Sequence, residues 1–199
     1  MLKEVLIILI LFILPFLLIY NKLIPKKYYL VALFTVLIFT LILVFVENVS
    51  PKDLGIRIDN FKQTYLPHLI FTFISLVVLL IFIKYNGSIP IKEWWLDRHF
   101  RYFFVIISFT QVFLFLGYFL PKLQVIFPSI WIAILVNGIM FASVHIFYKD
   151  FVAMFPLLIL GGVGFAAIYA FYPNLILAGI SHSILNFFIV LYGYLSVLK

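Results

Sequence analysis

A few polar residues interrupt a chain that is otherwise almost entirely apolar, and their types are those that activate water. They are Glu93, His145, His182 and Asn186. His182 and Asn186 are four residues apart, so both side chains lie on one face of a helix. An ionisable group at the centre of a transmembrane helix costs about 2.5–3.5 kcal/mol on insertion scales. Because of that cost, these positions are candidates for a functional site, and a glutamate, two histidines and an asparagine can together activate a water molecule.

Each of these residues also has a purely structural interpretation. Glu93 would be a solvated charge at the membrane interface, and His145 an interfacial histidine near a helix end. His182 and Asn186 would form a buried hydrogen-bonded pair. Arg98 follows Glu93 by five residues, about 140° around a helix, so it is not a simple partner for Glu93. It would snorkel to the interface, or bind a neighbouring loop or a substrate carboxylate.

The composition requires these residues to be positioned by membrane helices. The 199 residues are 66% hydrophobic, 20% aromatic and only 11% charged. A soluble domain of this size cannot cover so much apolar surface, whereas a polytopic membrane protein exposes it to lipid. We therefore expect an all-α, polytopic transmembrane helix bundle. Residues 1–199 form one membrane domain, with N-terminal spans and an interfacial segment at 1–64 and a helical core at 65–199.

Apolar runs of spanning length, near 20 residues, predict about seven transmembrane helices. The runs cover residues 4–20, 28–46, 65–83, 102–120, 126–147, 151–172 and 174–197. The first is a retained span rather than a signal peptide, because it is long and lacks a small-residue cleavage site. The fourth helix could begin earlier, near Lys92. Turns are expected at Pro121–Lys122, Lys149–Asp150 and Pro173–Asn174.

The remaining sequence features concern the membrane interface and helix packing. Residues 47–64 predict a loop or short amphipathic segment lying at the interface. Gly162, Ala166 and Ala170 recur every four residues, which predicts close helix packing around His182 and Asn186. Lysine and arginine are more numerous on the side of the C-terminus, nine against five, so this side is predicted to be cytoplasmic.

Several function classes are disfavoured by composition and by missing motifs. The net charge of +7 is spread over short connecting segments, which favours contact with anionic lipid head groups over nucleic acid. No cysteine is present, so thiolate nucleophiles, disulfides and cysteine-ligated zinc are excluded. Neither a G-x-S-x-G elbow nor an H-E-x-x-H motif occurs.

The order and spacing of the polar residues resemble the CAAX protease and bacteriocin-processing (CPBP, abortive-infection) family of intramembrane proteases. That family carries E-E-x-x-x-R, then F-x-x-x-H, then H-x-x-x-N or H-x-x-x-D. Phe141 with His145 matches the second motif, and His182 with Asn186 matches the third. Over roughly residues 50–190, the D-L-G-I stretch at 53–56 and the glycine-rich run before His182 also fit.

The resemblance implies a mechanism and reveals one departure. Glu93 and Arg98 keep the outer spacing of the first motif, but its second glutamate is Trp94 in this chain. The resemblance implies that Glu93 is the general base and that His145 orients the water. It also implies that His182 and Asn186 stabilise the oxyanion, with Arg98 and Phe141 in support. Some members of the family are non-proteolytic scaffolds, and a degraded motif is what such a member would show.

The sequence thus predicts a multi-pass intramembrane endopeptidase, of the bacterial cell membrane by resemblance, that acts on a membrane-associated peptide or protein. Bacteriocin processing and self-immunity fit the same family, and a non-catalytic scaffold or immunity protein is the main alternative. A transporter that relays protons is a third option. No cofactor is expected, although Glu93, His145 and His182 could form a zinc site. A shared water requires these three side chains to converge in a wet cavity between helices four, five, six and seven.

Overall fold

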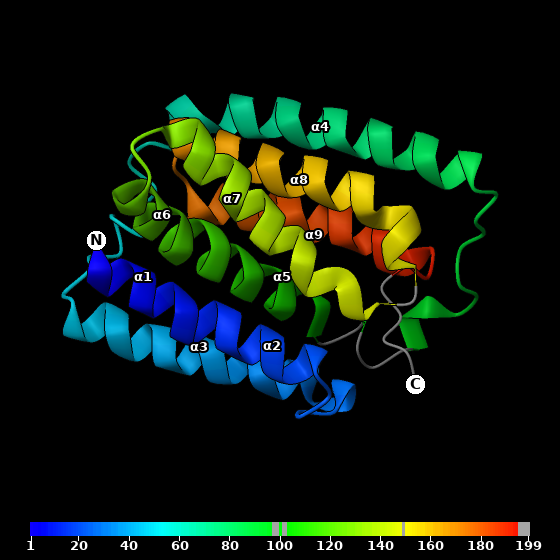
Figure 1. The fold of residues 1–199 in the computed structure, drawn as a ribbon. Coiled ribbons are helices and arrows are strands. Elements are labelled where there is room, and N and C mark those ends of the chain that lie inside the picture. The colour runs from blue at the N-terminus through cyan, green and yellow to red at the C-terminus, as the bar shows by residue number, and fades with distance from the viewer. Residues whose placement is uncertain (97–99, 101–102, 149, 195–199) are drawn as a thin grey trace.

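The computed structural model describes residues 1–96, 100, 103–148 and 150–194, and within these ranges the chain is helical with no β-strand. Figure 1 shows the helices lying side by side, roughly along one direction. The elements are α1 (Leu2–Ile8), a π-helical turn (Leu9–Ile13), α2 (Leu14–Tyr20), α3 (Tyr29–Val46), α4 (Phe61–Tyr85), a 3₁₀ turn (Trp94–Leu96), α5 (Phe104–Val112), a second π-helical segment (Phe113–Phe119), α6 (Leu120–Ile126), α7 (Ile130–Ser143), a 3₁₀ turn (Val144–Phe147), α8 (Phe151–Phe171) and α9 (Leu175–Leu191).

The helices confirm a polytopic membrane protein. Within the described ranges, six continuous helical stretches are long and apolar enough to cross a bilayer. They are Leu2–Tyr20, Lys26–Val46, Phe61–Tyr85, Phe104–Ile126, Ile130–Phe147 and Phe151–Phe171. The seventh apolar helix, Leu175–Leu191, is shorter than the run at 174–197 that predicted it.

The polar motifs lie in the most enclosed part of the bundle. Helix α9 contacts α4 and α5, and α7 packs along α8. In Figure 1, α4 covers one side of the bundle, and the hairpin of α1, α2 and α3 covers the opposite side, against α5 and α6. In the span that contains α5 and α6, 67% of the most apolar stretch is buried, compared with 11% in the span of α3. The outer helices therefore shield the inner ones from lipid.

The turn predicted at Pro121–Lys122 is wrong, because the helix continues through α6 to Ile126 and turns at 127–129. Proline lacks an N–H, and its ring clashes with the carbonyl four residues earlier. Here the preceding segment, Phe113–Phe119, is π-helical, and this wider turn accommodates the proline without ending the helix. The same arrangement occurs in the first span, where the π-helical turn Leu9–Ile13 precedes Pro15.

Glycines allow the close helix packing that the small-residue pattern predicted. A Cβ placed on Gly162 would lie 2.8 Å from the carbonyl oxygen of Gly138, and one on Gly138 would lie 2.7 Å from the backbone nitrogen of Val163. Helices α7 and α8 therefore touch backbone to backbone. A Cβ on Gly179 of α9 would lie 2.4 Å from the ring of Phe109 in α5. These contacts fix the helices that carry His145 and His182.

The interfacial segment before α4 ties down the start of α9. Gly55 has a φ of +73°, and its carbonyl accepts a hydrogen bond from the backbone N–H of Leu175 at 2.8 Å. The hydroxyl of Tyr169 donates to the carbonyl of Leu54 at 2.8 Å. A Cβ on Gly55 would lie 2.4 Å from that hydroxyl, so only glycine fits there. The D-L-G-I stretch is thus a structural tether for the helix that carries His182.

Candidate functional site

A cavity of about 180 Å³ brings together the residues of the second and third motifs. His145, His182 and Asn186 all contribute to its lining, and each of the three residues is at most 7% exposed. Phe141 also lines it, with its ring 4.9 Å from that of His145 and 5.5 Å from that of His182, measured between centroids. Residues that are 37 or more apart in the chain therefore face one shared space.

The 3₁₀ turn at the end of α7 orients His145. Its Nδ1 lies 2.8 Å from the carbonyl oxygen of Phe141, one turn earlier. A carbonyl only accepts, so Nδ1 carries the proton and donates it. In the neutral ring, the lone pair then resides on Nε2. His145 is thus held in the tautomer that can accept a proton from, or orient, a water molecule.

On α9, His182 and Asn186 are held by two polar residues of α5. The Nε2 of His182 lies 3.1 Å from Oε1 of Gln111 and 3.1 Å from Nδ2 of Asn186. The same Nδ2 donates to the hydroxyl of Ser108 at 2.9 Å, and that hydroxyl donates to the carbonyl of Phe104 at 2.7 Å. The third motif is therefore part of a buried chain of hydrogen bonds that spans two helices.

The structure does not bring Glu93 into this cavity. Glu93 is exposed, lies in the turn before Trp94–Leu96, and has a φ of +55°. This region of φ costs a non-glycine residue about 1–3 kcal/mol. Nearby, the backbone N–H of Ile91 donates to the carbonyl of Leu191 at 2.8 Å, which anchors the segment to the end of α9. Glu93 is therefore on the surface near the C-terminal end of α9, outside the cavity lining, and Arg98 lies outside the described residues.

Trp94 occupies the position of the second glutamate and packs as an apolar anchor. Its ring centroid is 5.2 Å from that of Phe187, the residue after Asn186, and 4.6 Å from that of Phe100. An edge-to-face aromatic pair contributes about 0.5–1.5 kcal/mol beyond burial. At this position, Trp94 thus holds the loop against α9 and offers no second carboxylate.

The three residues that could form a zinc site are not grouped together in the described part of the structure. Among the residues that the structure describes, no three His, Asp or Glu side chains are grouped closely enough to hold a metal. Glu93, His145 and His182 all belong to the described part. The two histidines line the cavity, whereas Glu93 is exposed outside it. The ligand set proposed for zinc is therefore not assembled in this conformation.

Two features of the site differ from the prediction. The fourth span, which contains α5 and α6, was expected to form one wall of the cavity. That wall is formed instead by the third span, α4, which contributes Ile74, Ser75, Val78 and Leu79. The functional residues that sequence reasoning missed are Gln111 and Ser108, both in α5 and both at most 2% exposed. Their signal was present, because uncharged polar residues inside an apolar span also need a hydrogen-bond partner. Their partners, however, are 71 and 78 residues away.

A comparison with family models finds a match that covers this region. Residues 94–188 match the model described as "Type II CAAX prenyl endopeptidase Rce1-like". The matched region contains both histidine motifs and begins directly after Glu93. Comparisons with curated proteins and with solved structures give no match. The motif resemblance is therefore confirmed by an independent match over the helical core.

Proposed function

We propose that the chain, whose residues 94–188 match the family model of Rce1-like type II CAAX prenyl endopeptidases, is an intramembrane endopeptidase. Its substrate is a membrane-associated peptide or protein. The observation that carries the proposal is the shared cavity, whose lining includes both motif histidines and Asn186. Two histidines and an amide on one buried cavity match the needs of amide hydrolysis.

The proposed reaction is the addition of water to the scissile carbonyl carbon. Glu93 takes one proton from the water as the new C–O bond forms, and the Nε2 of His145 orients that water. His182 and Asn186 donate hydrogen bonds to the oxyanion of the tetrahedral intermediate. The C–N bond then breaks, and the proton passes to the leaving amine. For Glu93 to act, the exposed turn must move inward over the cavity mouth.

The cavity lining supports an apolar substrate that arrives from the bilayer. From the histidines, the lining extends to the outer faces of α4 and α8, where Ile74 is 55% and Leu160 is 66% exposed. Those side chains face the region that lipid occupies around a membrane protein. A substrate anchored in the membrane would therefore reach His145 without crossing an aqueous loop. Prenylated C-terminal peptides and bacteriocin leader peptides are the substrates to test first.

A non-catalytic scaffold or immunity protein is the second candidate function, and one observation favours it. The carboxylate expected to activate water is exposed, and Trp94 replaces the glutamate next to it. A partner would then bind the helices, and the buried histidines would serve stability alone.

Cleavage by the purified protein separates the two functions. The full chain in lipid nanodiscs is incubated with prenylated and leader-type peptides, and products are identified by mass. An endopeptidase yields products that disappear in Glu93→Gln, His145→Ala and His182→Ala, while each variant still accumulates in the membrane. Turnover that persists in Glu93→Gln would rule out this glutamate as the base. A scaffold gives no products, and its partner binding tolerates Glu93→Gln.

A further inference from the structure

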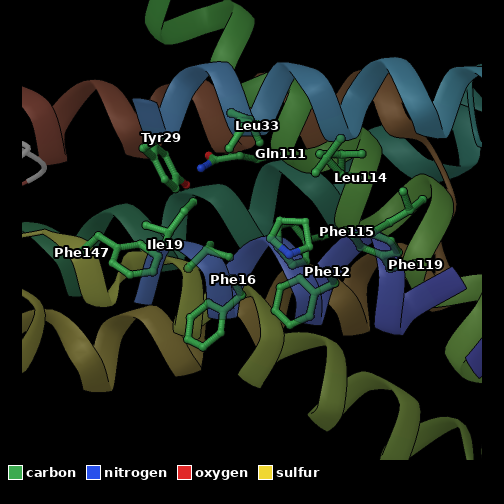
Figure 2. A pocket seen from close by; sticks show the side chains of 15 residues that line it. Phe12, Phe16, Ile19, Tyr29, Leu33, Gln111, Leu114, Phe115, Phe119 and Phe147 are labelled. Atoms are coloured by element: carbon green, nitrogen blue, oxygen red, sulfur yellow. The ribbon is translucent and has the colours of Figure 1, made fainter. Parts of the chain in front are cut away.

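Gln111 lies between the candidate site and a second, smaller cavity. It is 2% exposed within the span formed by α5 and α6. The second cavity, of about 60 Å³, lies between the N-terminal hairpin and the span that contains Gln111, and its lining is mostly apolar (Figure 2). A buried amide without hydrogen bonds costs several kcal/mol in an apolar setting. Gln111 is therefore expected to make directed contacts on both sides.

The two ends of the Gln111 amide face different partners. Its Oε1 lies 3.1 Å from the Nε2 of His182. Its amide nitrogen is left to face the hydroxyl of Tyr29, with which the side chain interacts. Figure 2 shows the side chains of Gln111 and Tyr29 directed towards each other across the top of the cavity. Tyr29 comes from α3, outside the region matched by the family model, so the hairpin determines which end of the amide faces His182.

This orientation decides the tautomer of His182. Because Oε1 accepts a hydrogen bond, the Nε2 of His182 must donate one and carry the proton. Asn186 favours the opposite tautomer, since its Nδ2, at 3.1 Å from the same Nε2, is a donor. The orientation of Asn186 is itself fixed, because its Nδ2 donates to Ser108. Gln111 and Asn186 thus compete for one ring nitrogen.

We propose that Gln111 is the positioning residue of His182, which it holds with the proton on Nε2 and the ring aimed between the two amides. The role in turnover rests on the proposed endopeptidase function. In this conformation the Nε2–H of His182 is donated to Gln111, and oxyanion stabilisation requires the same N–H to turn to the substrate when it binds. Removal of Gln111 would leave Asn186 as the amide partner, and the proton would move to Nδ1.

The tautomer can be measured without any activity. The full chain is prepared in nanodiscs with ¹⁵N-labelled histidine, and the resonances of His182 among the four histidines are identified by their loss in His182→Gln. Gln111→Met keeps the length of the side chain but removes the amide, and we expect the proton to shift to Nδ1. Gln111→Glu still accepts a hydrogen bond and should keep the proton on Nε2. An unchanged tautomer in Gln111→Met overturns the proposal.

A matched control comes from another buried amide. Asn137 is fully buried in α7, and its Nδ2 donates to the carbonyl of Phe115 at 2.7 Å. Asn137→Ala removes a buried amide from the same bundle and should leave the His182 tautomer unchanged. Tyr29→Phe removes the group that orients Gln111 and should give a mixture of the two tautomers. A shift of equal size in Asn137→Ala would attribute the effect to general loosening and overturn the proposal.

Kinetics test the consequence for turnover. Loss of a group that orients a catalytic residue typically lowers activity by roughly 10–100-fold, so Gln111→Met should lower kcat to that extent with KM within about twofold. Gln111→Glu should recover most of the loss. A kcat in Gln111→Met equal to that of the wild-type protein overturns the positioning role. If the wild-type protein cleaves nothing, the endopeptidase function fails, and the NMR measurement still decides whether Gln111 holds His182.

Discussion

The two halves of the predicted site differ in how firmly the fold holds them. In the histidine half, His145, His182 and Asn186 are buried, line one cavity and each have a hydrogen-bond partner. In the glutamate half, Glu93 is exposed on a turn with φ +55°. Helix packing can position a side chain within a fraction of an ångström, whereas an exposed turn positions it loosely. The proposed reaction therefore depends on whether the turn closes.

Glu47 shows how this fold holds a carboxylate that has a structural role. At the opposite end of the bundle, Glu47 lies 2.8 Å from the Nζ of Lys3 and 2.6 Å from that of Lys122, and its side chain is 7% exposed. Partial burial alone would raise the pKa of Glu47, but the hydrogen bonds from both lysines outweigh it and lower that pKa. Glu47 joins three spans, so its role is structural. Among the residues that the structure describes, no ion pair holds Glu93 in this way, which suits the proposed role of a group that moves and accepts a proton.

The largest expected effect is in the histidine half. His182→Ala should lower the rate of peptide cleavage by at least roughly 100-fold, as loss of an oxyanion donor does. His145→Ala removes the group that orients the water and should lower the rate by a comparable factor. Expression and thermal unfolding of the protein in nanodiscs should show that both variants fold. Activity within a few-fold of the wild-type level in either variant would mean that the cavity is not where the reaction occurs.

Accessibility sharpens the contrast between the halves. The chain has no cysteine, so Glu93→Cys and His182→Cys can be compared directly with a membrane-impermeant maleimide. We expect labelling at position 93 to be faster than at position 182 by at least about tenfold, because only the first site is exposed. A non-cleavable substrate peptide should slow labelling at position 93 if the turn closes over it. Equal rates at the two positions would show that the cavity is open to water.

Restoring the second glutamate tests whether the departure from the family motif limits activity. Trp94→Glu removes the aromatic contact with Phe187, which should destabilise the folded protein by about 0.5–1.5 kcal/mol. If the chain is an enzyme limited by this position, cleavage should rise several-fold despite that loss. Trp94→Phe is the control, since it keeps an aromatic ring and adds no carboxylate. A scaffold would show lower stability and no gain in cleavage.

The smallest effect on cleavage is expected at Glu47, where the change is in stability and depends on pH. Its pKa is lowered from 4.5 in the folded protein, so its contribution is complete above about pH 4.5. The contribution is lost as the pH falls through the folded pKa. Glu47→Gln should destabilise the protein at pH 7 by about 1–3 kcal/mol and have a smaller effect at pH 3, as measured by thermal unfolding in detergent. Cleavage at pH 7 should persist, in contrast to Glu93→Gln.

Local patterns in the sequence predicted much of the fold and half of the site. Apolar runs located the spans, and the four-residue spacing of His182 and Asn186 placed them on one face. The helix through Pro121 was missed, because a π-helical turn that accommodates a proline leaves no evident mark in composition. The wall formed by α4 was missed for another reason. Long-range packing decides which helix lies against α8 and α9 at the cavity. A hydropathy profile cannot distinguish α4 from the span that contains α5 and α6, because both are apolar.

The sequence by itself determined that this protein is a multi-pass helical membrane protein with two histidine motifs, because hydrophobicity and helical period are properties of short segments. Only the tertiary structure decided that His145 and His182 share a cavity, that Gln111 faces His182, and that Glu93 lies outside. Each of those facts joins residues from different helices. Their relative placement follows from close contacts such as Gly138 with Gly162 and Gly179 with Phe109, which act at distances of a few ångströms across dozens of residues of chain.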